Sequence, residues 1–146
     1  MSDDAQAGFP LKETENRVDI ALAIPHRGDR FLVARRAEGL HLAGHWEFPG
    51  GKIRPDEKPV DAARRELTEE TGLIGAEWEP LVVVVHDYAE APLRFHVFLA
   101  RDPTGDVRMD AQRKHAWLSL EELLSLEMPE ANRQMLRALR WRVGRT

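Results

Sequence analysis

The sequence predicts an α/β fold in which helices cover both faces of a mixed β-sheet. Short runs of alternating or β-branched apolar residues recur along the chain, stretches of helical periodicity separate or follow them, and glycine and proline mark the breaks. Strands interleaved with helices in this way imply a sheet between helices. At 146 residues, of which 42% are hydrophobic, one domain can bury an ordinary core.

The strands are expected to form two hairpins and some shorter segments. Residues 18–24 alternate in polarity, residues 25–29 supply a turn, and residues 30–36 return as the partner strand. Residues 81–86 and 93–100 predict the second hairpin, and residues 46–48 and 116–118 predict short strands. Gly50 and Gly51, which follow Pro49, predict a sharp backbone turn that can come close to a ligand.

Three helices are expected. The first runs from an N-cap at Asp56 to about Thr71, with Pro59 in its first turn and Gly72 as a left-handed stop. Ser119 predicts the cap of the second helix, because Glu122 follows at the position of a capping box. Residues 130–142 predict a final amphipathic helix.

Composition excludes several classes of protein. No apolar run approaches the roughly 20 residues of a membrane span, and residues 1–16 read as a flexible polar tail without the features of a signal peptide. The absence of cysteine fits a cytoplasmic protein, and we expect a monomer. A net charge of −4 argues against a stable complex with nucleic acid, so the arginines after residue 130 are interpreted as a solvated helix face.

The chemistry is concentrated in residues 51–73, which read GKIRPDEKPVDAARRELTEETGL. Helical spacing places Glu66 on one face with Glu69 at i+3 and Glu70 at i+4. Like charges at this spacing repel one another, and a hard divalent cation such as Mg²⁺ or Mn²⁺ would remove the conflict because it prefers carboxylate oxygens. The segment therefore predicts a metal site on a helix.

Residues 51–73 match the pattern G-x5-E-x7-R-E-U-x-E-E-x-G-U, where U is apolar, at every position. The chain thus resembles the Nudix hydrolases, which implies an α/β/α sandwich over residues 17–146 and hydrolysis of a nucleoside diphosphate linked to another group. Residues 34–51 resemble the MutT branch, with an Arg-Arg pair, His41 and the run Glu-Phe-Pro-Gly-Gly. Residues 128–132, Met-Pro-Glu-Ala-Asn, resemble the segment that closes over an oxidised guanine in that branch.

The resemblance implies roles for particular residues. Glu66, Glu69 and Glu70 would bind Mg²⁺ or activate the attacking water, Arg65 would orient them, and Glu57 would play a lesser role at the metal. Gly50 would offer its backbone carbonyl to a metal ion. The remaining assignments concern the substrate: Arg36 and Lys52 for phosphates, and His41, Phe48 and Asn132 for the base.

The implied reaction is the Mg²⁺-dependent hydrolysis of 8-oxo-dGTP to 8-oxo-dGMP and pyrophosphate. Three alternatives stay open: a hydrolase of CTP or a modified pyrimidine nucleotide, a dinucleoside polyphosphate hydrolase, for which Tyr88 would be the mark, and an inactive Nudix module that binds nucleotide or nucleic acid. One position departs from the MutT pattern. Ala111 stands where an additional acid is expected, and Asp110 or Gln112 would have to replace it.

Overall fold

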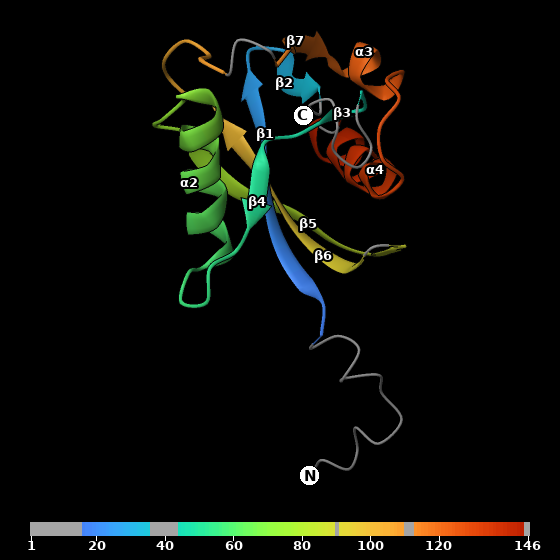
Figure 1. The fold of residues 1–146 in the computed structure, drawn as a ribbon. Coiled ribbons are helices and arrows are strands. Elements are labelled where there is room, and N and C mark those ends of the chain that lie inside the picture. The colour runs from blue at the N-terminus through green and yellow to red at the C-terminus, as the bar shows by residue number, and fades with distance from the viewer. Residues whose placement is uncertain (1–15, 36–43, 90, 110–112, 145–146) are drawn as a thin grey trace.

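The computed structural model describes residues 16–35, 44–89, 91–109 and 113–144, and these ranges hold seven strands and three helices (Figure 1). The strands are β1 (Val18–Arg27), β2 (Arg30–Arg35), β3 (Trp46–Glu47), β4 (Gly50–Lys52), β5 (Glu77–Tyr88), β6 (Ala91–Arg101) and β7 (His115–Ser119). The helices are α2 (Pro59–Thr71), α3 (Leu120–Leu124) and α4 (Ala131–Val143).

The strands form one mixed sheet, with the order β3-β2-β1-β6-β5, in which β4 also pairs with β1 and β7 with β2. β1 and β6 run parallel, whereas the other strand pairs of the described chain are antiparallel. On the side opposite β6, the first half of β1 pairs with β4 and its end pairs with β2. The chain therefore crosses between the two halves of this side of β1 on its way from β3 to β4.

Helices lie on both faces of this sheet, α2 on one face and α3 with α4 on the other (Figure 1). The arrangement confirms the predicted α/β/α sandwich with a mixed sheet. It also places the glutamates of α2 beside the crossing from β3 to β4, because α2 follows β4 and packs back over it and β1.

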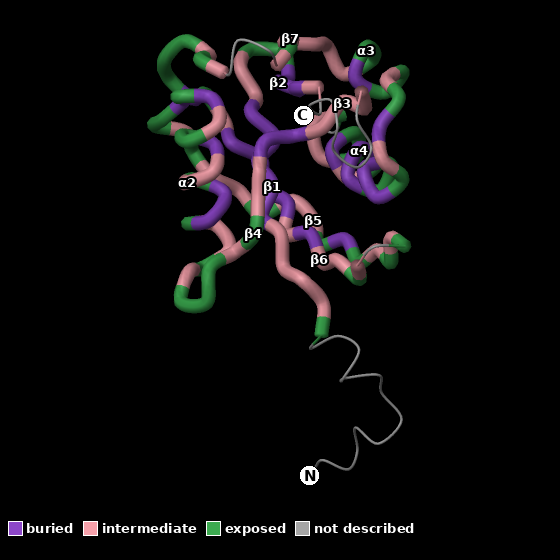
Figure 2. Tube along the Cα trace, viewed as in Figure 1, coloured by how far each residue is buried: buried purple, intermediate pink, exposed green. Residues whose placement is uncertain are grey.

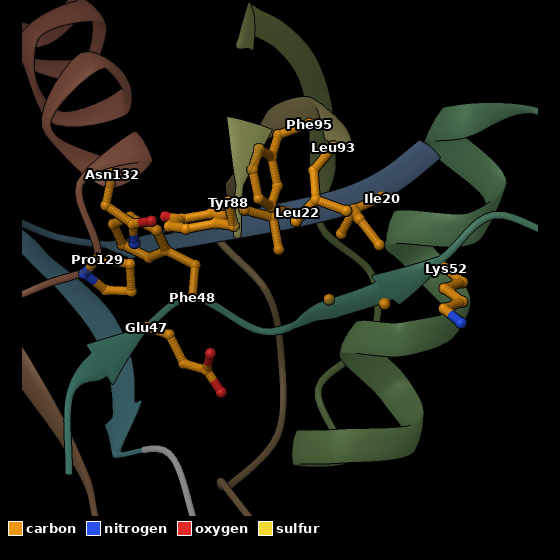
Figure 3. Close-up of a pocket in the computed structure, with 12 residues that line it drawn as sticks. Ile20, Leu22, Glu47, Phe48, Lys52, Tyr88, Leu93, Phe95, Pro129 and Asn132 are labelled. Carbon is orange, nitrogen blue, oxygen red and sulfur yellow. The ribbon is translucent and has the colours of Figure 1, made fainter. Parts of the chain in front are cut away.

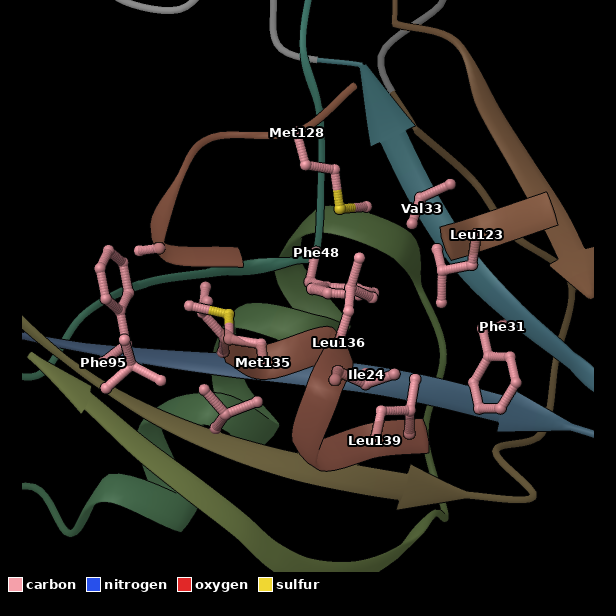
Figure 4. Packing of buried hydrophobic residues seen from close by; sticks show 14 of the residues in the cluster. Ile24, Phe31, Val33, Phe48, Phe95, Leu123, Met128, Met135, Leu136 and Leu139 are labelled. Carbon is pink, nitrogen blue, oxygen red and sulfur yellow. The ribbon is translucent and has the colours of Figure 1, made fainter. Parts of the chain in front are cut away.

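Residues of different size face the two helix layers. Leu22 and Ile24 of β1 join the larger core, which Met135 and Leu139 of α4 cover (Figure 4). The alternate residues Ala21 and Ala23 join two smaller clusters between the sheet and α2. The helix contributes Ala62, Ala63 and Leu67 to these clusters. Both faces are thus buried along the middle of β1 (Figure 2). Alanine on both sides lets α2 lie close to the sheet, which brings its carboxylates near the β4 backbone.

Several strand boundaries differ from those predicted. Residues 25–27 continue β1, so the first hairpin turns on Gly28 and Asp29 alone, with Gly28 at φ 62°. The strand continues because β6 runs beside it as far as the pair His26↔Arg101. The predicted second hairpin is confirmed with longer strands, and β3 and β7 match their predicted segments within one residue at each end.

The N-cap predicted at Asp56 is wrong, because Lys58 occupies that position and α2 begins at Pro59. A residue before proline favours extended backbone, as Lys58 shows with φ −74° and ψ 148°, and proline suits the first helical position. The predicted end is confirmed, with Gly72 left-handed at φ 81°. The capping box of Ser119 is confirmed, and α4 lies one residue later than predicted.

The sharp turn predicted at Gly50 and Gly51 is also wrong, since both residues lie in β4. Gly50 pairs with Leu22 of β1 so closely that a Cβ at residue 50 would lie 2.2 Å from the Ala21 carbonyl oxygen. Glycine at this position therefore serves close approach of two strands rather than a change of chain direction.

Candidate active site

Two glutamates of α2 face β4. Glu70 Oε2 accepts a hydrogen bond from the Gly50 N–H at 3.2 Å. Glu66 lies against Gly51, where a Cβ would come within 2.5 Å of Glu66 Oε2. The side chain of Glu66 is only 17% exposed, and that of Glu70 is 21% exposed. Successive turns of α2 thus direct two carboxylates at the Gly-Gly strand, and the missing side chain at Gly51 leaves the space that Glu66 fills.

The two carboxyl groups are coupled electrostatically. Burial, together with a hydrogen bond to Glu66 and its charge, raises the pKa of Glu70 to about 8, while Arg113 acts in the opposite direction. Near neutral pH, the pair therefore retains a proton in the absence of other cations. A divalent cation would compensate the same negative charge.

Glu69 stands apart from this pair. Its side chain is 55% exposed, and it contacts Arg65 Nη1 at 3.4 Å. Among the residues that the structure describes, no group of three or more His, Cys, Asp or Glu side chains converges on a possible metal position. The structure brings Glu66 and Glu70 together, and Glu69 does not join them. Two carboxylates beside the β4 backbone still fit Mg²⁺, which commonly uses one or two carboxylates and completes its shell with water and substrate phosphate.

Arg65 ties the preceding loop to α2. Its Nε and Nη2 donate to the two carboxylate oxygens of Glu57 at 2.8 and 2.9 Å, and its Nη1 donates to Glu66 Oε2 at 2.9 Å. The Arg65 guanidinium and the Arg54 N–H lower the pKa of Glu57 to about 2. Glu57 is therefore engaged with Arg65 and does not gather with the carboxylate pair, while Arg65 restrains the position of Glu66.

A cavity of about 260 Å³ opens beside β4 (Figure 3). Asn132, Tyr88 and Phe48 gather at one end, and Lys52 lies at the other (Figure 3). The remaining lining residues are Ile20, Leu22, Glu47, Gly50, Gly51, Leu93, Phe95 and Pro129. An apolar, aromatic end joined to a cationic end suits a ligand with a ring and an anionic chain.

Asn132 is buried at the aromatic end of the cavity, with 5% exposure. Its Nδ2 donates to Met128 Sδ at 3.7 Å, and a thioether is a weak acceptor. The side chain forms no other hydrogen bond within residues 16–35, 44–89, 91–109 and 113–144. The amide therefore has hydrogen-bonding capacity for a ligand. Tyr88 ties this end together, since its hydroxyl oxygen accepts the Ala131 N–H at 3.2 Å.

The other residues predicted for the site have different outcomes. Lys52 is exposed at the cationic end of the cavity, and Phe48 both lines the cavity and belongs to the main core. Arg36 and His41 lie outside the described residues, as do Asp110 and Gln112, so their predicted roles stay predictions.

Sequence reasoning did not identify Glu47 and Arg113 as site residues. Arg113 Nη2 donates to Glu47 Oε2 at 2.8 Å, and Arg113 Nη1 donates to Glu70 Oε1 at 3.4 Å. Glu47 stands in the Glu-Phe-Pro-Gly-Gly run, which could have drawn attention to it. No local pattern marks Arg113, because its partners are 66 and 43 residues away in sequence.

Comparison with known proteins agrees with this geometry. The NUDIX domain model matches residues 16–139. The CTP pyrophosphohydrolase of Escherichia coli (strain K12) is 30% identical over 121 residues, which cover 83% of this chain and 90% of that protein. The 8-oxo-dGTP diphosphatase of Buchnera aphidicola subsp. Acyrthosiphon pisum (strain APS) is 33% identical over 102 residues, with coverage of 70% and 82%. The crystal structure of the MutT protein from Methanosarcina mazei Go1 superimposes with a TM-score of 0.75 at 29% identity, covering 86% of this chain and 95% of that one.

Residues 51–73, which carry the family pattern, are called the box. An α/β/α sandwich with glutamates of this box facing a Gly-Gly strand defines a Nudix domain. This chain belongs to the Nudix family and is a Nudix hydrolase. None of the helices in the described ranges is long and apolar enough to cross a membrane.

Proposed function

We propose that this chain is a Mg²⁺-dependent nucleoside triphosphate pyrophosphohydrolase that converts 8-oxo-dGTP to 8-oxo-dGMP and pyrophosphate, with Mn²⁺ able to replace Mg²⁺. The observation that carries the proposal is the cavity that runs from the Asn132 amide to the strand facing Glu66 and Glu70. Relatives named as 8-oxo-dGTP diphosphatases support the substrate. Such an enzyme would act as a cytoplasmic monomer that removes an oxidised nucleotide before replication, without a stable nucleic-acid complex.

The phosphates would lie at the β4 end. Glu66, Glu70 and the Gly50 carbonyl would hold the cation, with Glu69 and Glu57 as further donors through family resemblance. When bound, Mg²⁺ supplies charge neutralisation at the phosphates and lowers the pKa of a bound water. Lys52 would pair with a phosphate oxygen at the cationic end, and Arg36 has the same role by resemblance. Arg65 would keep Glu66 in place while one of the box glutamates accepts a proton from the attacking water.

The base would lie at the other end. Phe48 and Tyr88 offer aromatic surface, and Asn132 offers a carbonyl acceptor and two N–H donors. The edge of 8-oxoguanine is mixed in the same manner, because its N7 has become a donor beside the O6 acceptor. His41 is assigned to this end by resemblance. A buried amide that meets both groups would reject bases that leave one unsatisfied.

CTP is the second candidate, because a CTP pyrophosphohydrolase is 30% identical and is covered over 90% of its length. Asn132 separates the two candidates. An ionised aspartate at this position would present only hydrogen-bond acceptors. The asparagine found here can also donate, as the mixed edge of 8-oxoguanine requires. The dinucleoside polyphosphate alternative gains no support, since Tyr88 lies at the base end and bonds to the start of α4.

The test is pyrophosphate release from 8-oxo-dGTP, dGTP, CTP and dCTP by the wild type, Asn132→Ala and a matched helix control, Gln134→Ala. The wild type should prefer 8-oxo-dGTP. Asn132→Ala should reduce the preference for 8-oxo-dGTP over dGTP by about ten-fold or more, chiefly through the Michaelis constant, since an unsatisfied polar group costs roughly 1–3 kcal/mol. Gln134 is exposed on the same helix, so its variant should keep the preference.

Each other result has a definite meaning. Unchanged discrimination in Asn132→Ala would remove the base-reading role of this residue. A wild type that prefers CTP would establish the second candidate instead of the first. Release of orthophosphate in place of pyrophosphate would show that cleavage does not occur between the α and β phosphates.

A further inference from the structure

Arg113 is a fixed cation at the edge of the site. It precedes β7, whose His115 pairs with Ala34 of β2. Its Nε donates to the Arg35 carbonyl at 3.0 Å, and the neighbouring Lys114 carbonyl accepts the Arg35 N–H at 2.9 Å. The guanidinium is therefore anchored to β2 through its inner nitrogen as well as through the backbone. Its two terminal nitrogens are held in defined directions as a result.

Those terminal nitrogens contact carboxylates from two different elements. Nη2 donates to Glu47 of β3 at 2.8 Å, and Nη1 lies 3.4 Å from Oε1 of Glu70 in α2. Glu47 lines the cavity, whereas Glu70 rests against the Gly50 N–H. Arg113 thus spans the crossing from β3 to β4, with one hydrogen bond on the cavity wall and one on the carboxylate pair.

We propose that Arg113 is a positioning residue that links the cavity wall at Glu47 to Glu70, so that the rate of hydrolysis depends on how the base is seated. The proposal rests on the function proposed above. A base that displaces Glu47 would rotate the guanidinium about its anchored Nε, and the rigid planar fork would carry that rotation to Glu70. A correctly seated base leaves Glu47 in place and keeps Glu70 aligned against β4. Arg113 acts through the two glutamates and is not a catalytic residue.

Replacing Arg113 with lysine distinguishes a bridge between Glu47 and Glu70 from a simple charge effect. An ammonium group carries the same charge but lacks a planar fork that reaches two carboxylates at fixed angles. A role limited to charge would survive Arg113→Lys, whereas a bridge would not. Arg27 offers a matched control, because its guanidinium also packs beside β7. It donates to the Pro103 and Gly105 carbonyls and lies 4.8 Å from the Trp117 ring, and these contacts involve neither Glu47 nor Glu70.

The bridge can be measured without catalysis, from urea unfolding of the full chain in EDTA. Glu47→Gln and Glu70→Gln are made singly and together, in the wild type and in Arg113→Met. Each substitution changes the unfolding equilibrium constant by some factor. In the wild-type background, the factor for the double variant should differ from the product of the two single factors by about three-fold or more. In Arg113→Met, the two effects should multiply without excess. Independent effects in the wild-type background would overturn the bridge.

The link to base seating is measured by kinetics on the best and the poorest triphosphate of the panel above. Arg113→Lys should lower kcat on the best substrate by about ten-fold, since it breaks a hydrogen bond between charged groups. On the poorest substrate, kcat should change by less than about two-fold, and KM should change little for either. Arg27→Lys should lower the urea midpoint and leave both kcat values unchanged.

An equal loss of kcat on both substrates, or full activity of Arg113→Lys on both, would overturn the link between base and rate. If the wild type hydrolyses no triphosphate, the proposed function fails together with this link. The unfolding experiment would then still decide whether Arg113 bridges the two glutamates.

Discussion

Replacing Glu70 with glutamine should make the metal-free protein more stable at alkaline pH. The side chain keeps its shape and an oxygen that can accept the Gly50 N–H. It loses a carboxyl group whose pKa is raised to about 8 by burial and by the neighbouring Glu66. In the wild type, ionisation of that carboxyl opposes folding, because the unfolded chain offers it water and no neighbouring carboxylate.

The sign and size follow from linkage. A folded pKa of about 8 against an ordinary 4.5 means that the folded state binds the proton more tightly. Stability from this proton is fully present below about pH 4.5, and it is lost as the pH rises through about 8. At about 1.36 kcal/mol per pH unit, the loss is at most about 5 kcal/mol. The variant also loses the charge partner of Arg113, worth roughly 1.5–3 kcal/mol, so a net gain of about 2 kcal/mol is expected at pH 9.

Urea unfolding in EDTA, followed by tryptophan fluorescence at pH 5, 7 and 9, measures this gain. The difference between Glu70→Gln and the wild type should be small at pH 5 and widen toward pH 9. Glu69→Gln is the matched control, because Glu69 lies on the same helix but is mostly exposed and contacts Arg65. Its effect should stay within about 0.5 kcal/mol at each pH. A Glu70→Gln variant that is less stable than the wild type at pH 9, or a difference independent of pH, would refute the reasoning.

Two further predictions concern activity. Hydrolysis should require Mg²⁺ or Mn²⁺ and stop in EDTA, and full turnover in EDTA would contradict this assignment. If Glu69 and Glu70 serve the cation and the attacking water, Glu69→Gln or Glu70→Gln should lower the rate by about a hundred-fold or more. Circular dichroism should show that the fold of each variant is intact. Gly51→Ala should lower kcat by about ten-fold or more, because its Cβ would lie 2.5 Å from Glu66 Oε2 and push that carboxylate away from β4; wild-type kcat in this variant would show that the position of Glu66 is not critical.

Local sequence signals anticipated much of the fold. Alternating residues predicted β1 and its neighbours, Gly72 marked the end of α2, and the Ser119 capping box marked the start of α3. Signals failed where a distant partner decided the outcome. Residues 25–27 became strand because β6 runs beside them, and Gly50 became strand because it fits against β1.

The site divides along the same line. The spacing of the box places Glu66, Glu69 and Glu70 near one another on a helix, since residues three and four apart share a face in any α-helix. The packing of Ala62, Ala63 and Leu67 of α2 against the sheet then sets the rotation of that helix. Glu70 faces β4 in consequence, whereas Glu69 is largely exposed and contacts Arg65.

The sequence by itself determined the family, the box and its cluster of carboxylates, because these depend on covalent spacing and helical geometry. Tertiary structure decided that Asn132, Phe48 and Tyr88 gather at one end of a cavity, and that Arg113 joins Glu47 to Glu70. These contacts join segments far apart in the chain. They exist only after the sheet brings β3, β7, α2 and α4 together, which no short-range pattern of residues specifies.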